Sequence, residues 1–335
     1  MALKAFPHYL WDPSYVTAEL RSAEDKFCES WLNYHSIPDE LQLFHYTTLQ
    51  GMQGILRDRS LWLSHVTSFN DPHEIEYGKK LIIEVLNDFV RREDSPVIRD
   101  FLSGILPFVQ SFGKQMHHAF VVCFCESGNL LSQWRGYADQ GCGYSLGFKF
   151  SEATQIASSL DNPTGEKIPG PFFRKVIYCP EQQKKLIESY LQGAVDAVRD
   201  LIGRIRKNRP DCAIMGVQAS NLILDMLLCF KHPAFAEEKE WRLFRVTRGD
   251  HEPETIRFKD TARLLVPYRP TYLFDVVENS MTKFPLRTVY SGPALEPTRA
   301  SAALELFLHN AASNASPIKL VRSDVQILNP GFELR

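Results

Sequence analysis

The order of strand-like and helix-like segments limits this chain to few fold classes. Apolar runs of strand length, rich in β-branched and aromatic residues, alternate irregularly with longer segments of helical periodicity. The strand-like runs are LQLFHY, SLWLS, AFVVCFCE, YSLGFKF, PFFRKVIYC and EWRLFRV, with shorter ones towards the C-terminus. Because helices do not separate these runs one by one, the order favours an α+β fold over a doubly wound parallel sheet. We predict a twisted, mixed and mostly antiparallel sheet with helical insertions.

Two helical regions interrupt the strand-like runs. The spacing of apolar residues predicts helices over 14–33, 73–93, 97–117, 181–207 and 213–230. We therefore predict a helical N-terminal extension over 1–39 and a single α+β domain over 40–335. The helical insertions of that domain are expected near 73–118 and 181–232.

Charge and cysteine content narrow the function classes. The 335 residues carry 38 basic and 40 acidic side chains, so no global basic field favours binding to nucleic acid. Seven cysteines without the spacing of a disulfide framework favour a reducing compartment. No signal-peptide pattern and no apolar run long enough to span a bilayer is visible. We expect a soluble, cytoplasmic protein with no membrane partner.

Polar residues end the first strand-like run, in the order His45-Tyr46-Thr47. Side chains alternate across a strand, so His45 and Thr47 project to one face if the strand continues that far. Thr47 or Thr48 serves equally well as the N-cap of the following helix, and His45 on its own fits a structural histidine. The segment is a candidate site with a structural alternative.

The stretch SFNDPHE after the second strand is a turn by its chemistry. Asp71 is placed to cap a helix that Pro72 opens, and Glu74 fits a capping box. This structural interpretation leaves the amide of Asn70 available to bind a ribose or a base edge, and we keep Asn70 as a candidate.

Glycine and cysteine patterns carry less functional information. The glycines at 141, 143 and 147 do not have the dinucleotide-binding spacing, and a strand follows them where that motif requires a helix. Cys123 and Cys125 are expected to be buried strand residues, since no ligand pair at zinc-site spacing follows them. We predict no metal.

Two further polar segments carry candidate binding residues. The segment LLSQWRGYADQG contains Trp134, Arg135 and Tyr137, and an aromatic ring beside a guanidinium can stack on a base and bind a phosphate. An ordinary surface loop pinned by Trp134 is an equal alternative. In EEKEWRLF, a strand would place Glu238 and Glu240 on one face together with Arg242. We interpret this as the rim of a cleft, with a salt-bridged strand end as the alternative.

Several of these motifs, taken in order, resemble a bacterial family. The set comprises FHYT, LWLS, FNDP, CFC, LLSQW, GYSLGF and EKEWRL. It is similar to domain-of-unknown-function family 2971 over about residues 41 to 330. That family name implies no activity.

A second, looser resemblance implies an enzymatic activity. A strand with H-x-T, a short helix, a second strand and a late strand bearing a glutamate is similar to the layout of ADP-ribosyltransferases, in which a small split sheet holds NAD. By position, His45 matches the ribose-binding histidine, Thr47 the hydroxyl near the nicotinamide, and Glu240 the glutamate at the reacting ribose. Glu238 resembles the first residue of a paired E-x-E, and Ser64 is an uncertain match to the hydroxyl of the second strand.

This resemblance implies cleavage of the nicotinamide–ribose bond through an oxocarbenium-like state, which a fixed carboxylate stabilises. We predict Glu240 and His45 as catalytic residues, with His45 orienting the substrate. The predicted substrate-binding residues are Tyr46, Thr47, Ser64, Asn70, Trp134, Arg135, Tyr137, Glu238 and Arg242. Of these, Trp134 or Tyr137 would stack on a ring and Arg135 would contact pyrophosphate.

The expected function is that of an NAD-consuming ADP-ribosyltransferase or NAD glycohydrolase, of toxin or phage-defence type. NAD is then a substrate, the acceptor is an unknown protein or nucleic acid, and a neutralising partner protein is a further expectation. A non-catalytic module that uses the same cleft to sense a nucleotide or bind a protein is the alternative.

Overall fold

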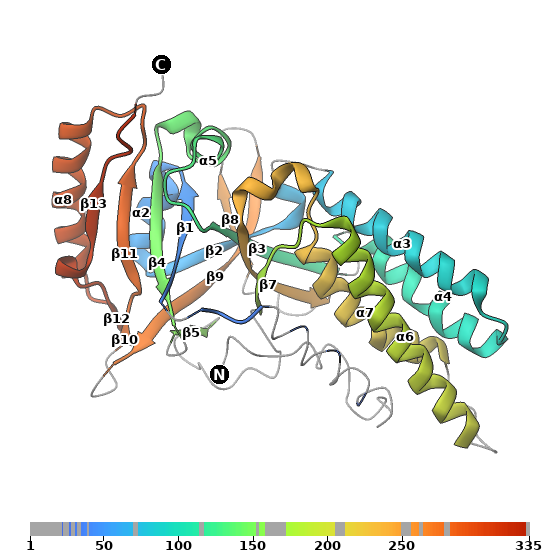
Figure 1. Cartoon of the computed structure of the whole chain (residues 1–335). Helices are drawn as coiled ribbons and strands as arrows, with labels where there is room; N and C mark the ends of the chain where they lie inside the picture. The colour runs from blue at the N-terminus through green and yellow to red at the C-terminus, as the bar shows by residue number, and fades with distance from the viewer. Residues whose placement is uncertain are drawn as a thin grey trace.

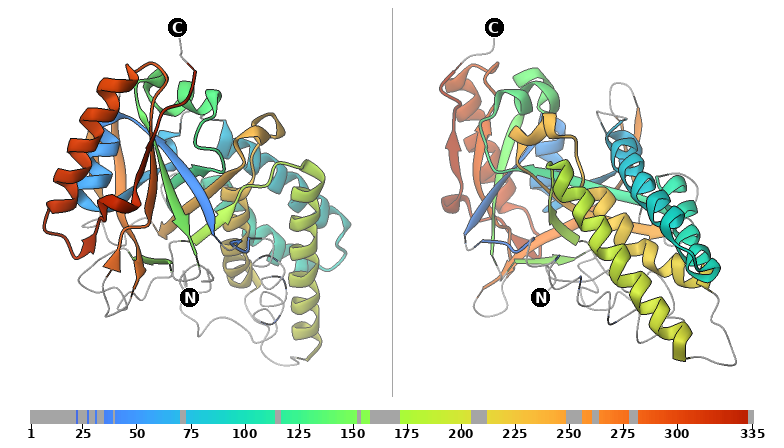
Figure 2. Two further views of the ribbon diagram at one scale, coloured as in Figure 1. Left: turned by 60° about the vertical axis from the view of Figure 1, so that its left-hand side comes forward. Right: turned by 45° about the vertical axis from the view of Figure 1, so that its right-hand side comes forward.

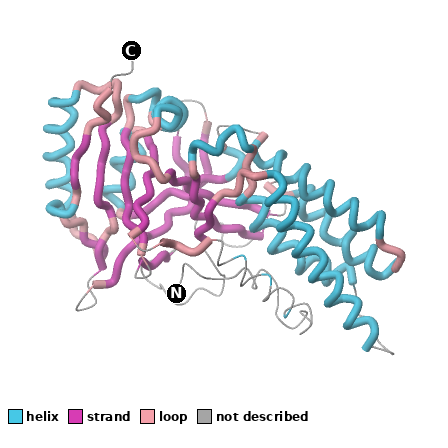
Figure 3. Tube along the Cα trace, viewed as in Figure 1, coloured by secondary structure: helices cyan, strands magenta, loops and turns pink. Residues whose placement is uncertain are grey.

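The computed structural model describes residues 22, 27, 31, 35–38, 40–69, 73–113, 117–151, 154–157, 172–204, 212–248, 256–260, 264–277 and 282–332. Their strands form one curved sheet with helices at both ends (Figures 1 and 3). The strands are β1 Leu41–Thr47, β2 Ser60–His65, β3 His117–Cys125, β4 Tyr144–Phe150, β5 Thr154–Ala157, β6 Phe172–Lys175, β7 Glu240–Arg248, β8 Arg257–Asp260, β9 Leu265–Val276, β10 Thr282–Lys283, β11 Leu286–Ser291, β12 Ile318–Lys319 and β13 Gln326–Leu328. The α-helices are α2 Leu49–Asp58, α3 Glu74–Arg92, α4 Pro96–Ser111, α5 Leu131–Tyr137, α6 Pro180–Arg204, α7 Cys212–Cys229 and α8 Pro297–Ser313, with short 3₁₀ turns between them.

The sheet is mixed and mostly antiparallel, as the sequence predicts. Its central order is β12-β10-β9-β2-β3-β1-β4-β11-β13, and β7 pairs with β3 along the whole length of β3. Only β10–β12 and β11–β13 pair in parallel among the described strands. The predicted α+β class with a mixed sheet is therefore confirmed.

Two hydrophobic cores lie on the two faces of the central strands. Alternation along β3 sends Val121 into one core and Phe120 and Val122 into the other. Helices α3, α4, α6 and α7 cover the Val121 face and extend side by side away from the sheet (Figure 2). Helices α2 and α8 pack against the core of Phe120 and Val122. The helical insertions predicted near 73–118 and 181–232 thus pack together as one group, with close contact between α4 and α7.

The sheet forks at one edge of β3, and this fork positions the site. Strand β2 pairs with β3 at Val121 and Phe120, whereas β1 pairs with the same edge at Cys125 alone. In the described strands no backbone partner pairs with residues 122–124 on that edge. Between the two arms, the imidazole Nδ1–H of His45 donates a hydrogen bond to the Cys123 carbonyl, with an N···O distance of 2.9 Å. A side chain thus replaces the missing backbone donor.

Other elements differ from the prediction in instructive ways. The segment predicted as a polar connection after β3 contains helix α5. Thr48, one of the two threonines proposed as a cap, is the N-cap of α2 and accepts a hydrogen bond from the Gly51 amide at 3.2 Å. Most of the predicted N-terminal extension lies outside the described residues. The buried indole of Trp31, which is described, packs in the core beside α6 and α7.

No helix in the described ranges combines the length and apolar character that a membrane span needs.

Candidate functional site

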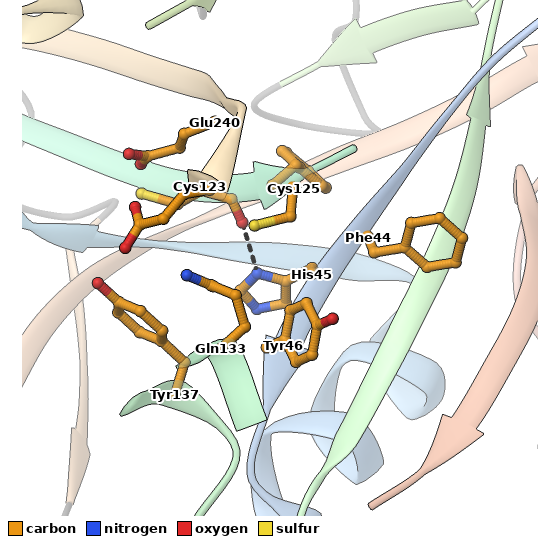
Figure 4. Close-up of a pocket in the computed structure, with 10 residues that line it drawn as sticks. Phe44, His45, Tyr46, Cys123, Cys125, Gln133, Tyr137 and Glu240 are labelled. Carbon is orange, nitrogen blue, oxygen red and sulfur yellow. Dashed lines mark hydrogen bonds between the residues drawn. The ribbon is translucent and has the colours of Figure 1, made fainter. Parts of the chain in front are cut away.

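A small cavity opens at the fork, between β1, β3, α5 and the start of β7. Its volume is about 50 Å³, which holds a few water molecules. It is lined by Phe44, His45, Tyr46, Cys123, Phe124, Cys125, Gln133, Tyr137, Glu238 and Glu240. Figure 4 shows the His45 ring between Cys123 above it and Gln133 beside it, with Tyr137 and Glu240 to one side and the Phe44 ring turned away. The cavity therefore joins residues that lie about two hundred positions apart in the chain.

His45 is held neutral at this site. Burial lowers the pKa of its imidazole to about 4, although the hydrogen bond to Cys123 favours the charged form. Because a carbonyl oxygen only accepts, Nδ1 carries the proton in that hydrogen bond, and the other ring nitrogen, Nε2, is an acceptor. The geometry therefore equips His45 to accept a hydrogen bond rather than to carry a positive charge.

Five buried charged side chains form a network beside the cavity. The Lys231 ammonium donates to Glu238 at 2.6 Å and to Glu240 at 2.9 Å, and lies 3.3 Å from Glu74. The Arg242 guanidinium donates to both oxygens of Glu240, at 2.9 and 3.0 Å, and also to Glu74. Three carboxylates against two cations leave a formal charge of −1 when all five are ionised. A cationic ligand group next to the cavity would meet a net negative field.

The pKa values of these groups follow from their partners. Burial alone would raise the pKa of Glu240, but Arg242 and Lys231 outweigh it and hold that pKa at about 2. Burial raises the pKa of Glu238, and the hydrogen bond from Lys231 only partly offsets this. For Lys231, the carboxylate of Glu240 overcomes burial, so its pKa is raised. Glu240 is thus a permanently ionised carboxylate at neutral pH.

Tyr137 forms the accessible side of the cavity. With 38 % of its surface exposed, it is the only large hydrophobic lining residue open to solvent to this extent among the described residues. Its ring comes from α5 and its hydroxyl points towards the acidic side of the cavity (Figure 4). Burial of the hydroxyl and the nearby carboxylates of Glu238 and Glu240 raise its pKa, whereas Lys231 lowers it.

Trp134, one of the two rings expected to stack on a ligand, does not line the cavity. Its indole is fully buried on the inner side of α5 and packs edge-on against Tyr46, with ring centroids 5.0 Å apart. The indole Nε1–H donates a hydrogen bond to the Asn129 side chain at 2.9 Å. Trp134 therefore anchors α5 and is closed to a ligand ring. Tyr46 touches the cavity, but its hydroxyl donates to the Ser127 carbonyl at 3.0 Å and accepts from the Leu130 amide at 2.7 Å. Both aromatic residues hold the segment before α5 in place.

Several other candidates lie away from the cavity. Arg135 is exposed on α5 and Thr47 ends β1, and neither lines the cavity. Ser64 lies on the β2 arm of the fork, where its hydroxyl accepts from the Lys259 ammonium at 3.0 Å. Asn70 lies outside the described residues. The predicted cleft therefore reduces to His45, Tyr46, Tyr137, Glu238 and Glu240, with Arg242 directly behind it.

The strand alternation predicted for the two glutamates is wrong in detail. Glu238 ends the 3₁₀ turn Pro233–Glu238, and Lys239 takes a left-handed conformation with φ of 42° before β7 starts at Glu240. Two different backbone elements therefore deliver the two carboxylates to one cavity.

Sequence reasoning missed two members of the charge network. The sequence predicts a capping box at Glu74, yet α3 has no side-chain cap and the Glu74 carboxylate accepts a hydrogen bond from Arg242 instead. Lys231 lies two residues after the end of α7 and is 2 % exposed. The one sequence feature that points to Lys231 is its place between an apolar helix and the acidic segment EEKE.

The cysteines behave as expected for buried strand residues. Cys125 is buried and Cys123 is partly buried, both as free thiols, and burial raises the pKa of each. In the described part of the chain, no group of three or more His, Cys, Asp or Glu side chains is arranged to hold a metal ion.

One comparison with known proteins gives a match. The sequence model of a family described as protein of unknown function (DUF2971) matches residues 133–243. The chain is similar to that family from α5 to β7, which includes Gln133, Tyr137, Glu238 and Glu240, whereas His45 lies outside the match. This range is shorter than the 41 to 330 that the separate motifs indicated. No curated protein and no solved structure matches the chain.

Proposed function

We propose that this chain is an NAD-consuming enzyme, an ADP-ribosyltransferase or NAD glycohydrolase, whose nicotinamide–ribose end binds in the cavity at the fork. The observation that carries the proposal is that His45 and Glu240, from distant parts of the chain, line one cavity. We further propose that the forked sheet corresponds to the split sheet of ADP-ribosyltransferases. A macromolecular acceptor, a neutralising partner, a role as a toxin or in phage defence, and a cytoplasmic location belong to the same proposal.

The charge of the site supports this ligand class. The nicotinamide ring of NAD is a pyridinium cation, and the network of Glu74, Glu238, Glu240, Lys231 and Arg242 is formally −1. The same field favours the ribosyl cation that forms as the glycosidic bond breaks. Stabilisation of a developing charge by a fixed, dry carboxylate lowers the barrier.

The reaction itself requires few groups. The C–N bond between ribose and nicotinamide breaks, and its electron pair passes to the ring nitrogen, which neutralises the pyridinium. Water or an acceptor nucleophile adds to the ribosyl carbon and then loses its proton. Glu240, with a pKa of about 2, serves as the charge-stabilising carboxylate and stays ionised throughout. Neutral His45 accepts a hydrogen bond from a ribose hydroxyl and thereby orients the sugar.

The cavity has to widen before a nicotinamide ring can enter. A volume of about 50 Å³ is too small for a nicotinamide ring, which needs a cavity on the order of the roughly 150 Å³ that holds benzene. Tyr137, the exposed lining residue, therefore has to swing outward for the ring to enter, and the rest of the dinucleotide lies outside the cavity.

The alternative function rests on a different observation. Both oxygens of Glu240 already accept hydrogen bonds from Arg242 and Lys231. A carboxylate held in this way is suited to shaping a binding site as much as to catalysis. A non-catalytic module that senses a nucleotide is therefore the second candidate, and it predicts thermal stabilisation by NAD without any product.

The test is nicotinamide release from NAD, followed by chromatography. Glu240→Gln should reduce the rate by about 100-fold or more. Because this change also alters the network, Tyr137→Ala provides a second variant at the accessible side. It removes the side chain that has to move before the ring enters, so it should lower KM. Leu131→Ala is the matched control, because Leu131 is exposed on the same helix and does not line the cavity, and it should behave as the wild type. Absence of release from the wild type, or an unchanged rate in folded Glu240→Gln, would overturn the proposed activity.

A further inference from the structure

A second polar group lies on the β2 arm of the fork, away from the acidic network. Lys259 of β8 reaches across β9 and donates from its ammonium to the Ser64 hydroxyl, with an N···O distance of 3.0 Å. The same ammonium lies over the indole ring of Trp62, 5.7 Å from its centroid. A cation, a hydroxyl and an aromatic face therefore meet at one place.

The charge of Lys259 is not balanced by any carboxylate that the structure describes. Among the described residues no carboxylate lies within ion-pair distance of it, whereas Lys231 contacts three. A hydroxyl satisfies one of the three N–H donors of an ammonium. A partly buried cation without an anion carries a desolvation cost, and burial lowers the pKa of Lys259 accordingly. An anion bound here would remove that cost.

The position of this group relates it to the cavity. Ser64 pairs with Val121, two residues before Cys123, whose carbonyl binds His45. The charge of Lys259 also contributes to the low pKa of His45. Glu240 and Arg242 of the acidic network stand on β7, along the other edge of β3. His45 therefore lies between a negative group on one side and a positive group on the other.

We propose that Lys259, Ser64 and Trp62 form a phosphate subsite for the nucleotide whose nicotinamide ring enters the cavity. The identity of the nucleotide rests on the proposed function. The arrangement matches the charge order of that ligand, which has a pyridinium cation, a neutral ribose and then a phosphate. The ammonium and hydroxyl donate to the phosphate oxygens, and the Trp62 ring shields the ammonium from water.

The first experiment compares nicotinamide mononucleotide with nicotinamide riboside, which lacks the phosphate, by calorimetric titration. The wild type should bind the mononucleotide about tenfold more tightly. Lys259→Gln should abolish this preference, Lys259→Arg should keep most of it, and Lys149→Gln, an exposed lysine of the same sheet, should leave it unchanged. Equal affinities of the wild type for the two ligands would overturn the subsite.

The second experiment separates the subsite from the proposed function. Trace acetylation of the wild type, mapped by mass spectrometry, should label Lys259 several-fold less in millimolar pyrophosphate, with Lys149 as the internal reference. Equal labelling with and without pyrophosphate would overturn the subsite, even if NAD releases nicotinamide. Protection of Lys259 in a protein that neither binds nicotinamide ligands nor cleaves NAD would refute the proposed function and leave the anion subsite standing.

Discussion

Replacing Lys231 should destabilise the protein, because it leaves excess negative charge in the buried network. In Lys231→Met, three carboxylates face Arg242 alone, so the formal charge changes from −1 to −2. The ammonium is buried and contacts Glu238, Glu240 and Glu74 within 3.3 Å. Loss of one partner from a buried ion cluster costs about 3 to 5 kcal/mol of unfolding free energy. We expect a loss of this size.

A second substitution tests whether charge, rather than packing, causes that loss. Adding Glu238→Gln restores a formal charge of −1, so the double variant should recover about 2 kcal/mol relative to the sum of the single changes. Acidification towards pH 5 should also reduce the deficit of Lys231→Met. The reason is that burial already raises the pKa of Glu238, and protonation of this carboxylate removes the excess charge.

Urea unfolding followed by tryptophan fluorescence measures these free energies. The control is Lys149→Met, because the Lys149–Glu40 pair has a similar length of 2.8 Å but is exposed. Its loss should leave the urea midpoint nearly unchanged, because exposed ion pairs contribute little to stability. Strict additivity of Lys231→Met and Glu238→Gln would refute the reasoning from charge balance.

Three further predictions concern stability. Burial and the charge of His118 lower the pKa of His65 from 6.5 to about 4, so its contribution is complete above pH 6.5 and is lost as the pH falls to 4. Urea unfolding at a series of pH values should show that the wild type loses roughly 3 kcal/mol of unfolding free energy on acidification and that His65→Gln does not. Parallel pH profiles of the wild type and the variant would contradict this. Gly54→Ala puts a methyl group into the Trp62 ring and should cost about 1 to 3 kcal/mol in urea unfolding, whereas an unchanged midpoint would show that the ring moves freely. Tyr46→Phe removes both hydrogen bonds to segment 127–130, and hydrogen exchange there should increase; unchanged exchange would show that Trp134 alone holds the segment.

Local patterns predicted much of the fold. Strands such as β1, β4 and β7, and the long helix α6, have clear apolar periodicity that matches their burial, whereas α7 is a largely apolar run of helical length. Helix α5 was missed because its seven residues are too short to show a period and include a glycine and three polar side chains. Trp134 was misjudged for the same reason, since its burial follows from the packing of α5 on β1.

The candidate site was predictable where its residues stand in or beside polar segments next to strand-like runs, as His45, Tyr137, Glu238 and Glu240 do. His45 and Glu240 could be found because histidine and glutamate are unusual at those positions. Glu74 and Lys231 could not, because the contacts that define them join residues far apart in the chain. A local sequence pattern does not predict such a long-range contact. The fork was likewise invisible, since it depends on which edge of β3 each neighbouring strand chooses.

The fork also places the cavity against a strand that both cores share. Along β3, Val121 faces α3, α4, α6 and α7, whereas Phe120 and Val122 face α2 and α8. A substitution in either core that displaces β3 therefore changes the width of the opening without replacing any residue of its wall. The preference of the proposed binding site can thus change during evolution through mutations remote from the pocket.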